Sequence, residues 1–313
     1  MTKSLLSFIA ILVLAQFSFG QGCSDAGFCT MGAMKPDQPY NKKVQLKLRT
    51  MELSFYRGTT TLTPVVYVAT ADFNFSLNAK NTVQLKVPYQ YVTGRLADTQ
   101  SLGDLSLCFT RNIFASDRFD VNLSVGGKIP TNNSDLSTNG RPLPMYYQTS
   151  LGTYDFIAGL SVINRKWLFA TGIQIPLNKN NNQFVWSAWD GTSEKPYVDL
   201  YDQAKNLSRG IDVMLRVERN FRFSRFNFSL GLLPIYRITR DEVTNSRLIR
   251  TSEDPQGNVA SGLALSGIAT LGYNFDTKSG VRLLVGHKIE QREFSPDGLT
   301  RELVSSVTYI YRF

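Results

Sequence analysis

Charged side chains recur at every second position in several otherwise apolar stretches of the chain. Asp212, Arg216 and Glu218 share one parity, and the residues between them include Val213 and Leu215. Alternate residues of an extended strand point to opposite faces, so charges of one parity gather on one face. Acids and bases on a shared inner face can line a water-filled passage and bias its ion selectivity, or they can pair with one another and fill a closed interior. The candidates for this pore-lining face are Asp72, Lys86, Asp120, Lys128, Asp212, Arg216, Glu218, Arg237, Arg282, Lys288 and Glu290.

Residues suited to nucleophilic or acid–base catalysis are scarce. The one histidine, His287, has the parity of the apolar residues around it. A Ser–His mechanism needs the two side chains within hydrogen-bond reach. Outer-membrane phospholipases place a serine two residues after their histidine, and here that position is Ile289. Because a Gly-x-Ser-x-Gly elbow, a phosphate-binding glycine loop and a cluster of metal ligands are also missing from the sequence, we expect no enzyme, no cofactor and no metal.

The three cysteines divide into a pair and a single residue. Cys23 and Cys29 lie close together in the sequence, with no histidine near them. An oxidising compartment favours a disulfide between them over a metal site. Lipidation of Cys23 is the alternative, although Gly20 stands where lipoproteins carry an aliphatic residue. We expect Cys108 to be a small residue on the inner face of a strand.

The N-terminus has the layout of a signal peptide. Lys3 precedes an apolar run, and Ser18 and Gly20 supply small residues before a cleavage site at Gln21. The run is too short for a transmembrane helix, which needs roughly 20 residues. We therefore predict an exported chain. Its expected division is 1–20 as signal peptide, 21–43 as a periplasmic or plug-like segment, and 44–313 as one folded domain.

Alternation of apolar and polar residues recurs twelve times along the chain and predicts strands with one apolar face. These stretches suit a tilted membrane strand of roughly 9–11 residues with overhang better than the shorter strands of a soluble sandwich. In the sixth stretch the parity changes near 152–154, which predicts a β-bulge. The stretches are 44–56, 65–77, 83–91, 105–110, 119–125, 146–163, 167–177, 211–218, 226–236, 263–273, 281–290 and 307–313.

The connections alternate between short and long. Every second connection is a tight turn, whereas most of the others are long, above all 178–206. Outer-membrane barrels have this asymmetry, with short periplasmic turns and longer outer loops. Phe114, Phe119 and Trp167 flank the short turns, as an interfacial aromatic girdle requires. The last stretch ends on Phe313 and resembles the terminal strand by which such barrels are recognised for insertion.

Composition is compatible with this interpretation. The chain carries 34 Lys and Arg against 25 Asp and Glu, a net charge of +9. Nucleic acid is an unlikely partner, because the basic residues are scattered along strands of an exported chain rather than clustered. Only 42% of the residues are hydrophobic. A barrel tolerates this because a membrane-spanning strand needs an apolar residue only at every second position.

Short motifs within 83–177 resemble a known family. They are Val87-Pro88-Tyr89, Ser101-Leu102-Gly103-Asp104-Leu105, Gly127-Lys128-Ile129-Pro130-Thr131 and Ser150-Leu151-Gly152-Thr153-Tyr154-Asp155. The pattern is similar to that of outer-membrane barrels named for the meta-pathway of phenol degradation, which are related to long-chain fatty-acid transporter-like barrels. Ser101 and Asn132 stand where that family usually has glycine. The resemblance implies a transporter for small, including hydrophobic, molecules, and it assigns no binding residue.

These observations predict an all-β, closed antiparallel transmembrane β-barrel of about twelve strands in the outer membrane of a Gram-negative bacterium. We expect passive passage of small solutes, with outer-membrane lipid, the barrel assembly machinery and the solute as partners; the oligomeric state stays open. A barrel that displays its outer loops to a protein partner is the alternative, and a lipid-modifying enzyme is the third choice. The display hypothesis rests on Trp186, Trp189, Tyr197 and Tyr201 in 178–206, which would also suit a loop packed over the barrel mouth.

Overall fold

The computed structural model describes residues 47–60, 62–244, 262–292 and 294–313, in which β-strands dominate. Three short helical turns lie in the connections: η3 (Met145–Tyr147), η4 (Trp186–Trp189) and α2 (Lys195–Val198). The strands are β1 (Lys47–Thr59), β2 (Val65–Ser76), β3 (Asn81–Thr93), β4 (Asp98–Leu102), β5 (Leu105–Ala115), β6 (Asp120–Ile129), β7 (Ser137–Thr138), β8 (Arg141–Pro142), β9 (Asp155–Ile163), β10 (Trp167–Pro176), β11 (Asp212–Phe223), β12 (Phe226–Arg237), β13 (Gly262–Asn274), β14 (Ser279–Glu290) and β15 (Leu303–Arg312).

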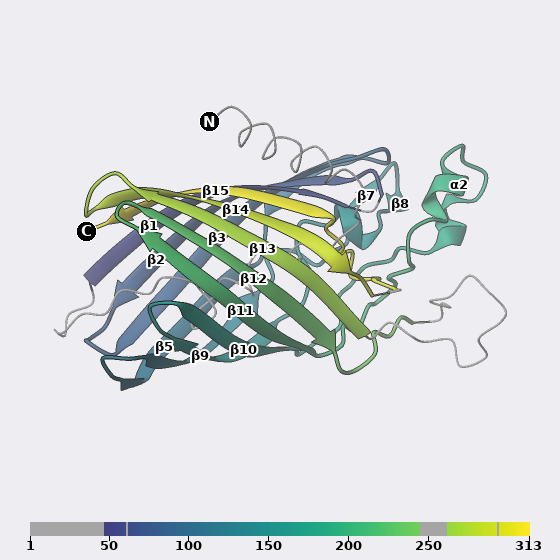
Figure 1. Cartoon of the computed structure of the whole chain (residues 1–313). Helices are drawn as coiled ribbons and strands as arrows, with labels where there is room; N and C mark the ends of the chain where they lie inside the picture. Colours follow the sequence, from purple (N-terminus) through teal and green to yellow (C-terminus); the bar gives the residue numbers. More distant parts are fainter. Residues whose placement is uncertain (1–46, 61, 245–261, 293) are drawn as a thin grey trace, which may run out of the picture.

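The sheet closes on itself as an antiparallel barrel (Figure 1). Strand β1 pairs with β15 on one side and with β2 on the other, and β2 continues to β3. Counted among the described residues, twelve strands surround the lumen when β4 and β5 are taken as two halves of one broken strand, because both pair with β3. Closure pairs the backbone groups of every strand without leaving an edge, which a bilayer demands. The predicted fold is confirmed.

Strand β4 gives way to β5 at Gly103 and Asp104. The Gly103 amide donates to the Pro88 carbonyl at 2.8 Å, so the backbone remains tied to β3 across the break. A Cβ at Gly103 would lie 2.5 Å from Nε2 of Gln90, so a larger residue here would require the Gln90 side chain to move. The break turns the Asp104 side chain away from solvent, to 6% exposure. The Asp104 side chain therefore faces the lumen, although Asp104 belongs to no strand.

The two faces of the barrel wall differ as the alternation predicts. The apolar row faces outward, where Phe55, Leu107 and Val307 are each 50% exposed or more. The polar row faces the lumen, where Asp72, Lys86 and others are nearly inaccessible. An uninterrupted outer band of exposed Leu, Val, Phe and Tyr would be untenable in water and is the lipid-facing surface of an outer-membrane barrel. Within the described ranges no helix is long and apolar enough to cross a bilayer.

The two ends of the barrel are built differently. Tight turns connect the strands at one end, where the C-terminus also lies. The long connections and α2 extend from the opposite end (Figure 1). Aromatic rings pack in pairs near the short turns, among them Phe114 with Phe119 at 5.3 Å and Tyr311 with Phe313 at 4.9 Å between centroids. The guanidinium of Arg219 lies 4.9 Å from the ring of Trp167. These rings form the expected interfacial girdle, so we refer to this end as periplasmic and to the other as outer.

The sixth predicted strand is wrong over its first half. Strand β9 begins only at Asp155, whereas 145–154 forms η3 and an irregular segment without the predicted bulge near 152–154. Gly152 has a φ of +69°, and a Cβ there would lie 3.0 Å from the Asn133 backbone. Tyr147 and Leu151 are buried in hydrophobic clusters of the outer connections, and they do not lie on one face of a β-strand. The other predicted strands are present with ends that differ by a few residues, and 44–46 lies outside the described residues.

Candidate functional site

The inner row of the wall brings predicted lumen residues into cross-strand pairs. Asp72 on β2 is opposite Lys86 on β3, and Nζ of Lys86 lies 3.8 Å from Oδ2 of Asp72. Nε2 of Gln84 donates to the same oxygen at 2.7 Å. On the far side of Asp72, the register places Glu52 opposite it, and Glu52 lies 3.7 Å from Arg282. The wall is therefore charged on its inner side, and opposite charges are adjacent along it.

Aromatic residues of the longest outer connection pack into the barrel mouth. Tyr201 is completely buried, and its ring meets Tyr146, Tyr147, Phe184 and Tyr197 at centroid distances of 5.1–6.5 Å. The same cluster includes wall residues of β2, β3 and β15. We call the segments 130–154, 177–211 and 294–302 the mouth loops. The aromatic side chains on which the display hypothesis rested are largely buried in the mouth.

Tyrosine hydroxyls of this cluster bond to one another. Tyr197 Oη lies 2.5 Å from Tyr201 Oη, and Tyr147 Oη lies 3.3 Å from it. Burial raises the pKa of Tyr147 to about 12 and raises that of Tyr201 still further. The hydroxyls of Tyr147 and Tyr201 are thus uncharged at physiological pH, and the cluster joins the 177–211 loop to the 130–154 loop.

Below the aromatic cluster, seven charged residues form a buried network that we call the mouth ion cluster. Arg237 at the end of β12 bonds Asp212 at 2.7 Å, Asp297 at 2.8 Å and also Asp241. Arg209 bonds Asp155 at 3.0 Å. Each member is at most 7% exposed, so these charges persist because they are paired. The members are Arg209, Arg237, Arg292, Asp155, Asp212, Asp241 and Asp297.

The cluster holds its central carboxylate ionised. Burial raises the pKa of Asp297, but Arg237, Arg292 and Arg209 outweigh burial and hold the pKa well below its usual range. Burial lowers the pKa of Arg209, and the neighbouring carboxylates of Asp155 and Asp297 more than reverse this. Because its members come from β9, β11, β12 and three connections, the cluster ties the mouth loops to the wall.

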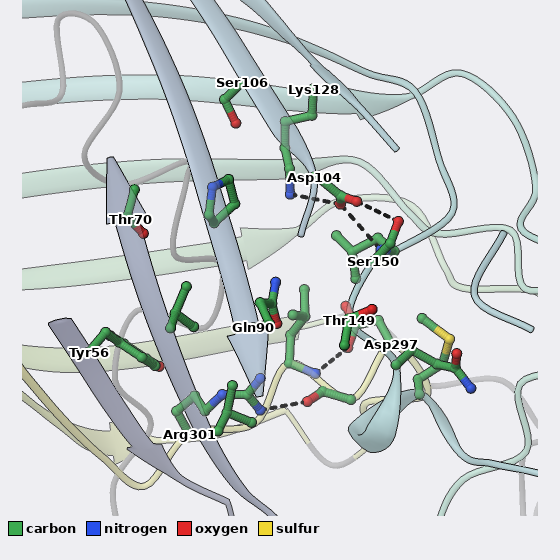
Figure 2. Close-up of a pocket in the computed structure, with 18 of the residues that line it drawn as sticks. Tyr56, Thr70, Gln90, Asp104, Ser106, Lys128, Thr149, Ser150, Asp297 and Arg301 are labelled. Atoms are coloured by element: carbon green, nitrogen blue, oxygen red, sulfur yellow. Dashed lines mark hydrogen bonds and ion pairs between the residues drawn. The ribbon is translucent and has the colours of Figure 1, made fainter. Parts of the chain in front are cut away.

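An outer pocket of about 720 Å³ lies beneath the mouth loops. Figure 2 shows Lys128 and Ser150 on either side of Asp104 within it. Nζ of Lys128 lies 3.5 Å from Asp104, and the Ser150 hydroxyl donates to Asp104 at 2.5 Å. The Leu151 amide donates to Asp104 at 3.2 Å. Asp104 therefore anchors the 145–154 segment to the wall, and the pocket has both polar and apolar sides.

A second chamber, the inner vestibule, opens toward the periplasmic end. It has a volume of about 1300 Å³ and is lined by strands β1, β2, β3, β5, β6, β14 and β15. A smaller pocket of about 520 Å³ adjoins it and shares Arg282, Ile310 and Arg312. Besides charged residues, the lining is mostly Asn, Ser and Thr. The vestibule is larger than the outer pocket and the adjoining pocket.

A packed layer separates the outer pocket from the inner vestibule. Along β2, β3 and β5 it consists of Asp72, Gln84 and Cys108, each at most 4% exposed. Cys108 is on the inner face, as expected. Apolar inner-row residues from the other strands continue the layer: Ile157, Leu168, Ala170, Met214, Leu233 and Ile268. The Arg216–Glu218 pair is buried at its margin, with Nε of Arg216 at 2.5 Å from Glu218. Solutes crossing the lumen would have to pass this layer.

The predicted lumen residues therefore fall into distinct places. Asp212 and Arg237 belong to the mouth ion cluster, Lys86 and Lys128 to the outer pocket, and Asp120 and Arg282 to the inner vestibule. Asp72, Arg216, Glu218 and Lys288 are buried in the inner row. Whether any of them contacts a moving solute stays a prediction.

Glu290 is the exception among the predicted lumen residues. The register of β13 and β14 shifts so that Lys288 pairs with Ser266 but Glu290 pairs with Leu265. The extra residue moves Glu290 out of the inner row, and its side chain is exposed. Strict alternation thus fails at this strand end because of a bulge, and Glu290 lines none of the three pockets described above.

Several site residues lie outside the alternating stretches and were missed. Asp104, Arg209, Asp241, Arg292 and Asp297 are in connections, where periodicity has no meaning. The aromatic content of 178–206 was the one sequence signal that the outer loops are packed. Cys23, Cys29, the signal peptide 1–20 and segment 21–43 lie outside the described residues. Those predictions remain untested.

The catalytic alternative depends on His287. His287 lies in the outward row of β14, opposite Gly267 on β13 and Leu303 on β15. Within the described ranges, no group of three His, Cys, Asp or Glu side chains has metal-binding geometry.

Solved structures similar to this chain are outer-membrane proteins. An outer-membrane channel from Pseudomonas putida F1 superposes with a TM-score of 0.62, covering 88% of this chain and 100% of that chain at 11% identity. The chain has the fold of an outer-membrane β-barrel. The NanC porin (TM-score 0.44, 9% identity, 84% of this chain and 98% of that chain) and the outer membrane phospholipase A of Escherichia coli (0.40, 9%, 85% and 98%) are more distant. No family model and no curated protein matches the chain.

Acidification is expected to loosen the mouth only below about pH 4. An exposed carboxyl in an open mouth has a pKa of about 3.9. The lowered pKa of Asp297 contributes stability that is present above this value and is lost as the pH falls through the lowered pKa. Burial raises the pKa of Asp241, so its protonation in mild acid favours the closed mouth and does not oppose it. Conductance recorded at stepwise lower pH should stay constant from about pH 7 to about pH 5 and rise below about pH 4.

A transition centred between about pH 5 and about pH 7 would contradict this assignment of the cluster. The matched control is Asp276→Asn at an exposed periplasmic turn, where hydrogen bonds from Ser279 and the Lys278 amide lower the pKa of a carboxylate far from the mouth. It should leave the pH profile unchanged.

Proposed function

We propose that this protein is an outer-membrane channel through which small solutes diffuse passively, with its mouth closed by the mouth loops in the conformation described. The observation that carries the proposal is the lumen itself: a charged and polar inner wall with a chamber on each side of a thin packed layer. Eight-stranded barrels can be filled by side chains, whereas a wall of twelve strands encloses more space. The polar lining supports solutes that travel with water.

The resemblance to the phenol-degradation family would favour hydrophobic solutes, and family membership stays a prediction. The lining of the vestibule instead supports polar solutes, since Asn, Ser and Thr predominate. Delivery by the barrel assembly machinery is likewise proposed, from the outward aromatic row of β15 that includes Tyr309. Loop display to a protein partner loses its main support because Trp189, Tyr197 and Tyr201 are buried.

The test is conductance of the purified full-length protein in planar bilayers, together with solute flux into liposomes. We expect discrete channel currents. Thr82→Trp places a bulky ring in the vestibule, because Thr82 lines it. Val83→Trp is the matched control, since Val83 is the next residue on β3 and faces lipid beside Phe109. Thr82→Trp should lower the conductance by about half or more, and Val83→Trp should leave it unchanged.

Absence of both current and flux from folded, heat-resistant barrels, in the full-length protein and also in a variant that lacks residues 183–201, would refute the channel. Equal effects of the two substitutions would show that current does not pass through the vestibule.

A further inference from the structure

We infer that the inner vestibule makes this channel select small organic anions, such as carboxylates, over cations; the inference rests on the proposed channel function and deepens it. The side chains that carry charge in the vestibule and its adjoining pocket are unequal in number. Among the described residues that line the vestibule, the cationic side chains are Arg49, Lys80, Arg282 and Arg312, and the anionic ones are Glu52 and Asp120. These described side chains therefore carry an excess of two positive charges.

This excess lies in the periplasmic half of the lumen. Higher in the barrel, Lys86 is paired with Asp72, Lys128 with Asp104, and Arg216 with Glu218. The mouth ion cluster contains three arginines and four aspartates, so it supplies no positive excess. A solute that enters the lumen meets its largest unbalanced field in the vestibule. Low-dielectric walls concentrate such a field and raise the local concentration of oppositely charged ions.

The arginines of the vestibule are placed so that they keep donors for an anion. Among the described residues, the hydrogen-bond partner of the Arg312 guanidinium is the neutral Oδ1 of Asn274, at 3.4 and 3.5 Å. Arg282 is 3.7 Å from Glu52, a separation at which an ion pair is weak. Nε of Arg49 is buried without a hydrogen-bond partner among the described residues. A carboxylate is the natural partner of a guanidinium, because its two oxygens match the two N–H donors.

The neutral lining narrows the class of solute further. Side-chain amides of Asn74, Asn112 and Asn122 and hydroxyls of Thr82 and Thr110 line the chamber. They offer donors and acceptors to hydroxyl groups, and together with Thr50, Ser76 and Asn78 they outnumber the apolar residues of the lining, which are Phe75, Ala79, Ile163, Ile310 and Phe313. Small hydroxylated carboxylates fit this combination of charge and hydrogen-bonding groups.

The test is the reversal potential of the full-length channel in a KCl gradient, followed by uptake of gluconate and of choline into liposomes. We expect a permeability ratio that favours chloride and gluconate. Arg312→Gln and Arg282→Gln should each lower the ratio, and together should reduce it by about twofold or more. Arg219→Gln is the matched control, because Arg219 lies at the same end of the barrel but stacks on Trp167 on the outer surface.

Arg282→Gln removes the contact between Arg282 and Glu52, which could impair folding. Folding is therefore checked by heat-modifiable mobility. Arg312→Gln tests selectivity without removing an ion pair among the described residues. Current with cation preference, or a ratio that Arg312→Gln and Arg219→Gln change equally, would overturn the inference while leaving the channel intact. If the closed mouth keeps wild-type currents too small to give a reversal potential, the same substitutions are measured in a channel in which a Gly/Ser linker replaces residues 183–201. Lack of current there too would reject the channel, and the inference with it.

Discussion

Replacing residues 183–201 by a short Gly/Ser linker is expected to raise single-channel conductance about threefold or more. This segment contributes Phe184, Trp189, Tyr197 and Tyr201 to the aromatic cluster in the mouth. Removing it leaves the strands of the wall complete, because β10 ends at Pro176 and β11 begins at Asp212. The barrel should therefore insert and fold normally while its outer end opens.

A short linker can replace the segment because the chain on its two sides is close in space. The Asn206 amide donates to the Asn182 carbonyl at 2.8 Å, so the two ends of the segment already lie side by side. Tyr201→Ala tests the same idea without shortening the chain and should give a smaller increase. Leu200→Ser is the matched control, because Leu200 is 50% exposed and its loss should not affect the mouth. Unchanged conductance in the deleted channel would show that these residues do not obstruct the passage.

Arg237→Met is expected to destabilise the closed mouth by about 3–5 kcal/mol, because it leaves buried carboxylates without their cationic partner. Arg237 is fully buried and bonds Asp212, Asp241 and Asp297 at once. Methionine retains some of the length of the side chain but none of its five donors. The mouth loops should open, giving larger and noisier currents and rapid proteolysis of the loops in intact, folded barrels.

Arg240→Met controls for the loss of a positive charge near the same strand end, because Arg240 is exposed. It should leave current and protease resistance unchanged. Adding Asp241→Asn and Asp297→Asn to Arg237→Met should restore much of the closure, since uncharged side chains are less costly to bury. Protease-resistant loops in Arg237→Met alone would refute the role of the mouth ion cluster.

The barrel wall could be predicted because its signal is local. Residues such as Val83, Leu85 and Val87 face lipid on one side of β3. Alternate residues of a strand point to opposite faces, so the alternation of apolar and polar residues indicates which ones face lipid. The alternation of short and long connections then determined the orientation of the ends. Prediction failed where the period was broken by tertiary contacts: at 145–154, which packs in the mouth, and at Glu290, which a bulge turns outward.

By itself, then, the sequence determined that this chain closes into a transmembrane barrel with a charged inner row. Only the tertiary structure decided which charges meet. Arg209, Arg237 and Asp297 are far apart along the chain and come together because closure of the barrel gathers three connections at one rim. The pairing of β14 with β15 places Arg282 and Arg312 in the lining of the same chamber, where the described cationic side chains outnumber the anionic ones. Pairing of charges depends on distance in space, and no periodicity in a sequence encodes it.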